Sequence, residues 1–374
     1  MEDEELALVW FSYNDFSFSK TEKILREFNK TSDIFNKKLV ENAFFDFDTN
    51  NEAKTKLLKI DYEKFKNQIA DELYKYNISA ITYISKNYPE KLKNIDEPPL
   101  VLYVRGDESL LNKKSISIVG TRKPTDYGKI VCEKFTKELS ESGLVTVSGL
   151  AYGTDTIVAE STLKAGGKTI AVLAGGLNSI YPSQNKELAN RVAENGLLVT
   201  EYPVGTKPLA FQFINRNRIV AGLGLGTLII EAGKNSGTMS TAKFALDQGR
   251  ELFVVPGNIN SLQSEGTNSL IDEMPDTFTI SPDRILYRLK IKKRKQEKAP
   301  VQVDMTEDKI LKALSVSELN FDDLAEKTGV SPSELASKLI KMEMFGLVKR
   351  GASNTYYKMW QQFLELVKNN QIAK

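Results

Sequence analysis

The sequence predicts an α/β protein built on a doubly wound, mostly parallel sheet, with a small helical domain before the sheet and a winged helix-turn-helix after it. Six short apolar runs in the middle of the chain, each followed by a turn and a helical stretch, predict the sheet. Three helical segments and a hairpin near the C-terminus predict the winged helix. With 374 residues, the chain is too long for one domain of roughly 150 residues.

Residues 1–76 are expected to form the helical N-terminal domain. Residues 2–76 contain neither glycine nor proline and place apolar residues such as Ile24 and Phe28 at helical spacing. The residues that follow hold turn-forming prolines and then a short apolar strand. This change of chemistry predicts the entry into a central domain, residues 77–289.

The central domain repeats a unit of strand, turn and helix along the chain. Its apolar runs and the turns that end them are residues 115–120, 144–149, 169–176, 197–203, 227–233 and 251–257. In a doubly wound sheet the ligand lies at the carboxyl ends of the strands, where loops lead into helix N-termini. We therefore expect the functional site in the turns that follow these runs.

The residues after the central domain change character again. Residues 290–300 hold six basic residues and one acidic residue, which predicts a basic linker. The C-terminal domain, residues 301–374, is expected to be the winged helix. Its expected helices and hairpin are residues 309–314, 321–328, 333–345 and 347–359. The last helix carries basic and acidic side chains together, so contact with DNA and contact with protein both remain open for it.

The composition excludes several classes of enzyme. The chain contains no histidine, which removes the commonest general base, the Ser-His and Cys-His nucleophile pairs and most transition-metal sites. We therefore expect no catalytic residue, no metal and no cofactor. The formal net charge is only +2, so a polyanionic partner would have to be held by a local cationic patch.

The expected location is the cytoplasm, without membrane association. No run approaches the roughly 18 apolar residues of a membrane span, and the first residues lack the basic region of a secretory signal. The one cysteine, Cys132, cannot form an internal disulfide and is expected to fill the core.

The turn after the first strand of the parallel sheet carries the clearest anion-binding pattern. Gly120, Thr121, Arg122 and Lys123 precede a helix that is expected to begin near Lys129. Backbone N–H groups at a helix start, together with two cationic side chains, suit a phosphate group.

The turns after the second and third strands are rich in glycine, which lets the backbone approach a ligand closely. Asp155 is expected to be the N-cap of the helix that follows the second strand, and Tyr181 is expected to lie in the core. The candidate binding residues in these two turns are Gly149, Tyr152, Gly153, Gly175 and Gly176. Each of these glycines is equally compatible with turn geometry alone.

Residues 213–218 place two arginines and two asparagines beside an aromatic ring near the start of a helix. Such a set can clamp phosphates and stack a base. The candidates are Phe213, Asn215, Arg216, Asn217 and Arg218. An ion pair between Arg218 and Glu231 is the structural alternative. Farther along, the turn formed by Ser236, Gly237 and Thr238 could hold an oxyanion or simply cap the next helix.

Taken in order, these segments resemble the bacterial DNA-processing protein A family, also called DprA or Smf. The resemblance runs from about Tyr83 to Ile271 and includes the blocks SIVGTRKPTDYG, VSGLAYGTD, FINRNRIVAGL and IIEAGKNSGTMSTAKFAL. It implies a Rossmann-like core that binds single-stranded DNA, usually as a homodimer, and hands the strand to the recombinase RecA during natural transformation. It also implies that the DNA pocket is lined by Arg122, Phe213, Arg216, Asn217 and Arg218.

A nucleotide-cleaving enzyme is the alternative function. The glycine-rich residues 222–227, followed by Glu231, loosely resemble the motif of Rossmann-like phosphoribohydrolases. Because the chain lacks histidine and shows no paired carboxylates at a usable spacing, the sequence favours binding without catalysis.

Overall fold

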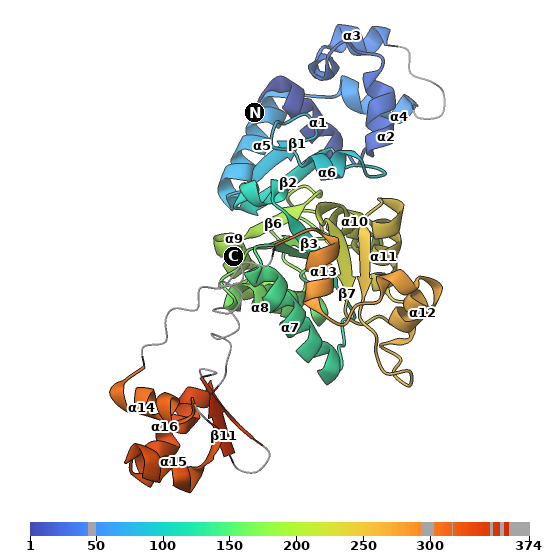
Figure 1. The fold of residues 1–374 in the computed structure, drawn as a ribbon. Helices are drawn as coiled ribbons and strands as arrows, with labels where there is room; N and C mark the ends of the chain where they lie inside the picture. Colours follow the sequence, from blue (N-terminus) through green and yellow to red (C-terminus); the bar gives the residue numbers. More distant parts are fainter. Residues whose placement is uncertain (44–49, 293–302, 316, 345–346, 352–354, 359–374) are drawn as a thin grey trace, which may run out of the picture. The chain divides into compact units, whose positions relative to one another are not determined.

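The computed structural model describes residues 1–43, 50–292, 303–315, 317–344, 347–351 and 355–358. Contacts within the chain divide it into two compact units, residues 1–294 and 295–374 (Figure 1). The first unit contains the helical N-terminal lobe and the sheet, and the second contains the winged helix. The finer boundaries expected at residues 76, 289 and 300 stay predictions, and most of the expected linker lies outside the described residues.

An eight-stranded sheet forms the centre of the first unit and confirms the predicted α/β class (Figure 1). The strand order is β1-β2-β6-β5-β4-β3-β7-β8. Strands β3 to β8 all pair with one another in parallel and match the six predicted runs. Strands β1 and β2 add an antiparallel edge next to β6. The strands are β1 (Ser79–Thr82), β2 (Val101–Gly106), β3 (Ser115–Val119), β4 (Val145–Ser148), β5 (Thr169–Val172), β6 (Leu197–Thr200), β7 (Gly226–Ile229) and β8 (Glu251–Val254).

The strand order creates a topological switch point between β3 and β7. The chain runs from β3 outward through β4, β5 and β6, and then returns to place β7 on the other side of β3. The helices that follow β3 and β7 therefore leave toward opposite faces of the sheet. This divergence opens a crevice at the carboxyl edge, which is where doubly wound sheets bind their ligands.

Helices cover both faces of the sheet. Helices α7 (Asp126–Glu141) and α8 (Thr154–Lys164) pack against each other, and α10 (Ala210–Leu223) packs against α11 (Gly237–Asp247) (Figure 1). The strands alternate between two cores, because Ile118 packs with Cys132 of α7 while Val119 packs with Ile219 of α10. The remaining helices of this part are α6 (Glu90–Lys93), η2 (Glu108–Asn112), η3 (Ser183–Asn185), α9 (Lys186–Asn195), α12 (Glu265–Glu273), η4 (Pro275–Thr277) and α13 (Pro282–Arg288).

The N-terminal lobe is helical, as predicted, and shares its core with the sheet. Trp10 and Phe11 of the first helix belong to the same buried cluster as Tyr103 of β2 and Leu198 of β6. The lobe consists of α1 (Asp3–Tyr13), α2 (Phe18–Leu25), η1 (Thr31–Phe35), α3 (Lys37–Asn42), α4 (Asn50–Leu58) and α5 (Tyr62–Tyr76).

The second unit has the three helices and the small sheet of a winged helix. Its first helix begins four residues before the predicted start, because the Asp304 side chain accepts a hydrogen bond from the backbone N–H of Glu307 and caps it. The elements are α14 (Met305–Ala313), β9 (Leu319–Asn320), α15 (Phe321–Thr328), α16 (Pro332–Met344), β10 (Val348–Arg350) and β11 (Thr355–Lys358). Part of the expected hairpin turn lies outside the described residues.

Composition predicted a buried cysteine and no membrane-spanning segment. Cys132 is fully buried, as predicted for a core residue, and burial raises the pKa of its thiol to about 12. A search of the helices in the described residues finds none that is both long and apolar enough to cross a membrane.

Candidate nucleic-acid interface

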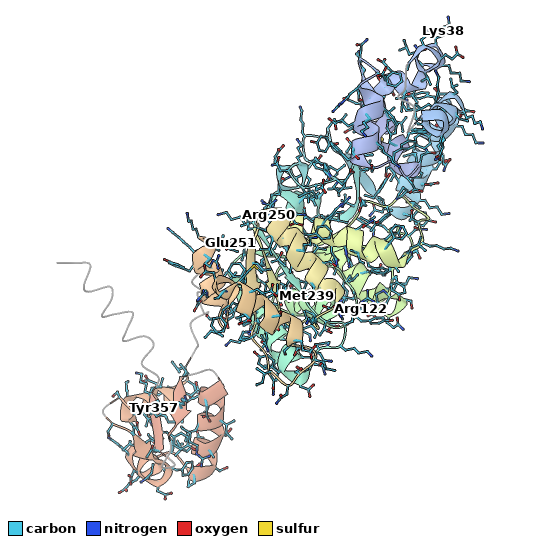
Figure 2. All side chains as sticks on the ribbon, turned by 90° about the vertical axis from the view of Figure 1, so that its right-hand side faces the viewer. Lys38, Arg122, Met239, Arg250, Glu251 and Tyr357 are labelled. Carbon is cyan, nitrogen blue, oxygen red and sulfur yellow. The ribbon has the colours of Figure 1, made fainter. Side chains whose placement is uncertain are left out.

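A cavity of about 480 Å³ opens at the switch point between β3 and β7. It lies where doubly wound sheets bind ligands, and loops from distant parts of the sequence meet there. Figure 2 labels Arg122 and Met239 toward the same end of the core, with Arg250 and Glu251, at the start of β8, farther away. The predicted residues that line the cavity are Gly120, Thr121, Arg122, Lys123, Phe213, Arg216, Asn217, Ser236, Gly237 and Thr238.

Arg122 and Lys123 supply exposed positive charge at the mouth of this cavity. The guanidinium carbon of Arg122 lies 5.4 Å from the centre of the Phe213 ring and over it, a cation–π contact. The loop that carries both cations contacts the β4–α8 loop closely. A Cβ on Gly153 would come within 2.5 Å of the Arg122 carbonyl oxygen, and Gly153 has a φ of +73°, so only glycine suits this position.

Glu231 fixes the start of the helix behind the cationic loop. Its carboxylate accepts hydrogen bonds from the Thr125 backbone N–H (2.9 Å) and the Thr125 hydroxyl (2.6 Å). The Thr125 hydroxyl oxygen in turn accepts from the Gly128 N–H, so α7 begins at Asp126 and not near Lys129 as predicted. A Cβ on Gly128 would lie 2.1 Å from the Glu231 carboxylate, which explains the glycine.

Arg216 forms the floor of the cavity. Only 4% of it is exposed, and it donates hydrogen bonds to the carbonyl oxygens of Gly149 (2.7 Å) and Val172. Burial lowers the pKa of Arg216, and burial also raises the pKa of Asp155 beside it, although the Arg216 charge opposes that rise. A Cβ on Gly149 would lie 2.4 Å from the guanidinium, so Gly149 makes room for Arg216 and does not line the cavity.

The start of α11 forms the opposite wall. The Asn217 side-chain amide donates to the Gly237 carbonyl oxygen at 3.2 Å and joins α10 to this turn. Ser236 is the N-cap residue, but its hydroxyl makes no side-chain cap bond. Among the described residues that hydroxyl has no hydrogen-bond partner although it is buried. A buried hydroxyl of this kind can donate to or accept from a bound group.

Arg218 does not reach this cavity. It forms an ion pair with Glu201 at 2.6 Å on the other side of α10, so the alternative pairing with Glu231 was wrong. The reason is helical geometry, since residues two apart point to different sides of a helix. Asn215 also lies on that other side, where it lines a different cavity.

Four more predicted binding residues lie outside the cavity lining: Tyr152, Gly153, Gly175 and Gly176. Asp155, which was expected to be an N-cap residue, does line the cavity but does not cap the helix. Gly153 is the N-cap residue of α8, and Asp155 lies in the first turn, where it accepts from the Ala151 N–H. The Tyr152 hydroxyl is hydrogen-bonded to Gln184. Gly175 and Gly176 instead contact the loop after β6, since a Cβ on either would meet its backbone, at Thr206 and Pro203 respectively.

Sequence reasoning missed several residues of the site region, among them Gln263 and Tyr181. Gln263 lines the cavity from the loop after β8, although nothing in its surroundings marks it as special. Tyr181 was expected in the core, but it is 50% exposed and touches Phe213. Its position just after the glycine-rich turn that follows β5 at the carboxyl edge was a signal that could have shown this.

A larger cavity of about 1260 Å³ lies along the other side of α10 and has the opposite charge. Among its charged lining residues, Lys207 and Arg218 face a larger number of carboxylates, and Arg218 is already paired. The carboxylates are Asp15, Asp96, Glu97, Glu201 and Asp247. Because these repel phosphate, the smaller cavity is the better candidate for binding nucleic acid.

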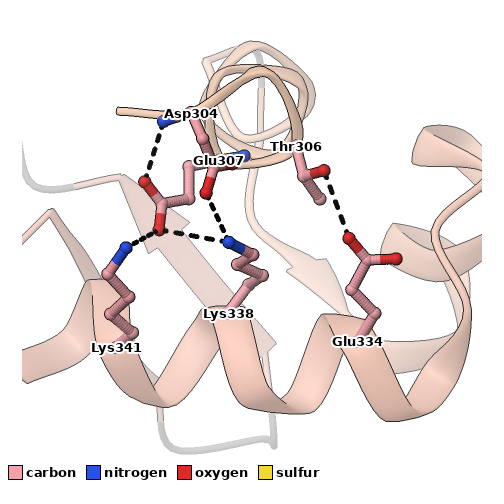
Figure 3. Close-up of polar contacts among 6 residues, drawn as sticks. All are labelled: Asp304, Thr306, Glu307, Glu334, Lys338 and Lys341. Carbon is pink, nitrogen blue, oxygen red and sulfur yellow. Dashed lines mark hydrogen bonds and ion pairs between the residues drawn. The ribbon is translucent and has the colours of Figure 1, made fainter. Parts of the chain in front are cut away.

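In the winged helix, the two lysines of α16 form ion pairs with carboxylates at the start of α14 (Figure 3). Lys338 of α16 contacts the carboxylates of Asp304 and Glu307, and Lys341 lies 2.7 Å from Glu307. Hydrogen bonding to Asp304 raises the pKa of Lys338. Helix α16, for which contact with DNA and contact with protein were both open, therefore presents little free positive charge on this face.

The comparisons with known proteins agree with this fold. A family model described as DNA recombination-mediator protein A matches residues 79–290. The chain belongs to this family. A second model, described as the DprA winged helix domain, matches residues 294–354, which agrees with the observed winged helix.

Relatives of the family match most of the chain. The DNA processing protein DprA of Bacillus subtilis is 42% identical over 229 residues, which cover 60% of this chain and 77% of the relative. Protein Smf of Escherichia coli is 35% identical over 274 residues, covering 71% and 73%. These identities confirm the family resemblance seen in the sequence motifs.

Two solved structures share the fold. The X-ray structure of DNA processing protein A from Streptococcus pneumoniae matches with a TM-score of 0.65 and 30% identity, covering 77% of this chain and 98% of that one. The Helicobacter pylori protein matches with a TM-score of 0.52 and 33% identity, covering 57% and 95%, and its structure concerns the binding mode of single-stranded DNA.

The role of Glu231 predicts a measurable loss of stability. Glu231→Ala leaves the partly buried N–H and hydroxyl of Thr125 without their acceptors, so we expect the free energy of unfolding to fall by about 1–3 kcal/mol. Urea unfolding followed by circular dichroism measures this as a lower midpoint. The control Glu133→Ala removes an exposed carboxylate from α7, the helix whose start Glu231 fixes, and should change the stability by less than about 0.5 kcal/mol. Equal midpoints for the two variants would contradict the assignment.

The ion pairs of the winged helix predict a dependence on pH. Burial alone would raise the pKa of Glu307, but its hydrogen bonds to Lys341 and to the Asp304 N–H outweigh this and lower it. A carboxyl with a lowered pKa stabilises the fold above the pKa of its unfolded form, and this stability disappears as the pH falls through the folded pKa. Thermal melts of wild type and Glu307→Gln should therefore differ at pH 7 and converge below pH 4. A constant difference over this range would argue against the ion pair.

Proposed function

We propose that this protein binds single-stranded DNA in the cavity at the β3/β7 switch point, without making or breaking a bond. One observation carries the proposal. Two exposed cations, a buried guanidinium, the unpartnered Ser236 hydroxyl and the start of α11 all converge there, and Asp155 is the only carboxylate among the described lining residues. Such a site attracts phosphate through charge and holds it through N–H and hydroxyl donors.

Family membership supports the same proposal. The Helicobacter pylori relative, studied for its binding mode of single-stranded DNA, has the same core fold at 33% identity. The volume of about 480 Å³ suits one or two nucleotides of a strand, since small-ligand pockets range from about 300 to 1,000 Å³. An unpaired strand can also offer its bases to the aromatic rings beside the cations.

The structure changes which arginines carry this role. Arg122 and Lys123 are exposed and are proposed to contact phosphates directly. Arg216 is buried, so its proposed role is to add positive charge at the floor of the cavity and to hold the ends of β4 and β5 in place. Arg218 is paired with Glu201 and has no proposed contact with DNA.

Arg122→Glu tests the proposal. Reversing this charge removes a phosphate contact and repels the next phosphate, so we expect the Kd for oligothymidylate to rise at least tenfold in 0.1 M NaCl. The slope of log K against log salt should also become shallower by about 0.7 for each phosphate that the variant no longer binds. Fluorescence anisotropy of a labelled oligonucleotide over a salt series measures both quantities.

The matched control is Arg191→Glu, which reverses an exposed charge on α9, outside the cavity lining. It should change the Kd by less than about twofold. An unchanged Kd for Arg122→Glu, or an equal effect of both reversals, would refute the assignment of the site.

We further propose that the bound strand is handed to the recombinase RecA during recombination and natural transformation, in the cytoplasm, by a homodimer formed through the core. Membership of the DNA recombination-mediator protein A family supports the mediator role. Exposed apolar side chains on the surface of the first unit, such as Ile280 (64%) and Tyr287 (82%), could contact a second copy of the chain.

The mediator role predicts faster growth of RecA filaments on single-stranded DNA. We expect wild-type protein to shorten the lag of RecA-dependent ATP hydrolysis, and Arg122→Glu to lose this effect in proportion to its loss of DNA affinity. If wild-type protein binds DNA and leaves the lag unchanged, the role in loading RecA is wrong while the DNA site stands.

A further inference from the structure

Tyr181 extends the aromatic wall of the cationic cavity. Its ring centre lies 5.6 Å from that of Phe213, and the two rings are inclined by 67°, an edge-to-face arrangement. The chain reaches this position through the loop after β5, whereas Phe213 belongs to α10. The two rings therefore come together from separate segments at one edge of the sheet.

The Phe213 ring is largely occupied by its neighbours. Arg122 lies over the ring at 5.4 Å and Tyr181 packs against it, so Phe213 itself is only partly exposed. A base stacked on the same face would have to displace the Arg122 guanidinium. Tyr181, in contrast, keeps half of its surface exposed. The larger free aromatic surface at this place therefore belongs to Tyr181.

The loop of Tyr181 is tied to the carboxyl edge of the sheet. Asn185 donates hydrogen bonds to the Leu150 carbonyl oxygen and to the Thr156 hydroxyl, both at 2.9 Å. Gln184 is bonded to the Tyr152 hydroxyl. Since the loop is already ordered by these contacts, a base that stacks on Tyr181 loses little affinity to the ordering of the loop.

We infer that Tyr181 is a base-stacking residue, which carries the bound strand beyond the cavity, with Phe213 as its support and Arg122 on the neighbouring phosphate. The inference rests on the proposed binding of single-stranded DNA. It assigns the stacking role to a residue that the sequence pattern places in the core, and it moves that role away from Phe213.

The test separates bases from phosphates. The probes are a labelled oligothymidylate of about 12 nucleotides, within the usual site sizes, and an abasic strand of equal length with the same phosphates. Tyr181→Ala should weaken binding of the oligothymidylate at least fivefold, the lower end for loss of one stacked base, and leave binding of the abasic strand unchanged. Tyr181→Phe should keep the wild-type affinity, and Tyr181→Leu should behave like alanine.

The control Tyr74→Ala removes an 89% exposed tyrosine from the N-terminal lobe and should affect neither probe. In Tyr181→Trp, the oligothymidylate should quench the added tryptophan emission and the abasic strand should not. Equal losses on both probes for Tyr181→Ala, or retained affinity in Tyr181→Leu, would overturn the stacking role. Failure of Arg122→Glu to weaken either probe would instead overturn the proposed DNA site itself.

Discussion

A buried guanidinium underlies the whole site. Arg216 lies beneath the carboxyl edge of the sheet and donates to carbonyl oxygens that follow β4 and end β5, with Asp155 of α8 beside it. A charge removed from water is costly unless its hydrogen bonds are satisfied, so the surrounding backbone has to remain in place around it. This constraint accounts for Gly149, whose missing side chain leaves space for the guanidinium. It also holds the Arg216 side chain in place as the floor of the cavity.

Helix α10 divides two regions of opposite charge. On one side, Phe213, Arg216 and Asn217 line the cationic cavity, and on the other, Asn215 and Arg218 line an acidic cavity. Each side draws on residues three or four apart in one short stretch of sequence, as a helix requires. The helix therefore places positive charge where a polyanion can enter and keeps the carboxylates away from it. A polyanion that meets the protein is attracted to one side of α10 and repelled from the other.

The winged helix shows a different use of charge. The lysines of α16 are neutralised by carboxylates of α14, and Glu307 is buried between them (Figure 3). These pairs join two helices of the unit, so the two lysines of α16 do not offer unpaired positive charge to duplex DNA.

The six parallel strands were predictable, because apolar runs followed by glycine-rich turns carry a strong local signal, whereas the switch point follows from the strand order that only the structure shows. Strand β1 was missed, since its residues Ser79–Thr82 form no continuous apolar run and no glycine-rich turn follows them. The cationic loop at Arg122 and the turn at Ser236 were expected along the same edge of the sheet, and they line one cavity because both follow strands that are neighbours in the sheet.

By itself, the sequence determined the class of fold, the family and the edge of the sheet that carries the candidate site, since these depend on local periodicity and on motifs in a fixed order. Only the tertiary structure decided which arginine is exposed, which is buried and which is paired. That outcome depends on the direction of each side chain and on partners far away in sequence, such as Glu201 for Arg218 and Phe213 for Tyr181. Burial and pairing arise from packing between distant segments, so no local pattern records them.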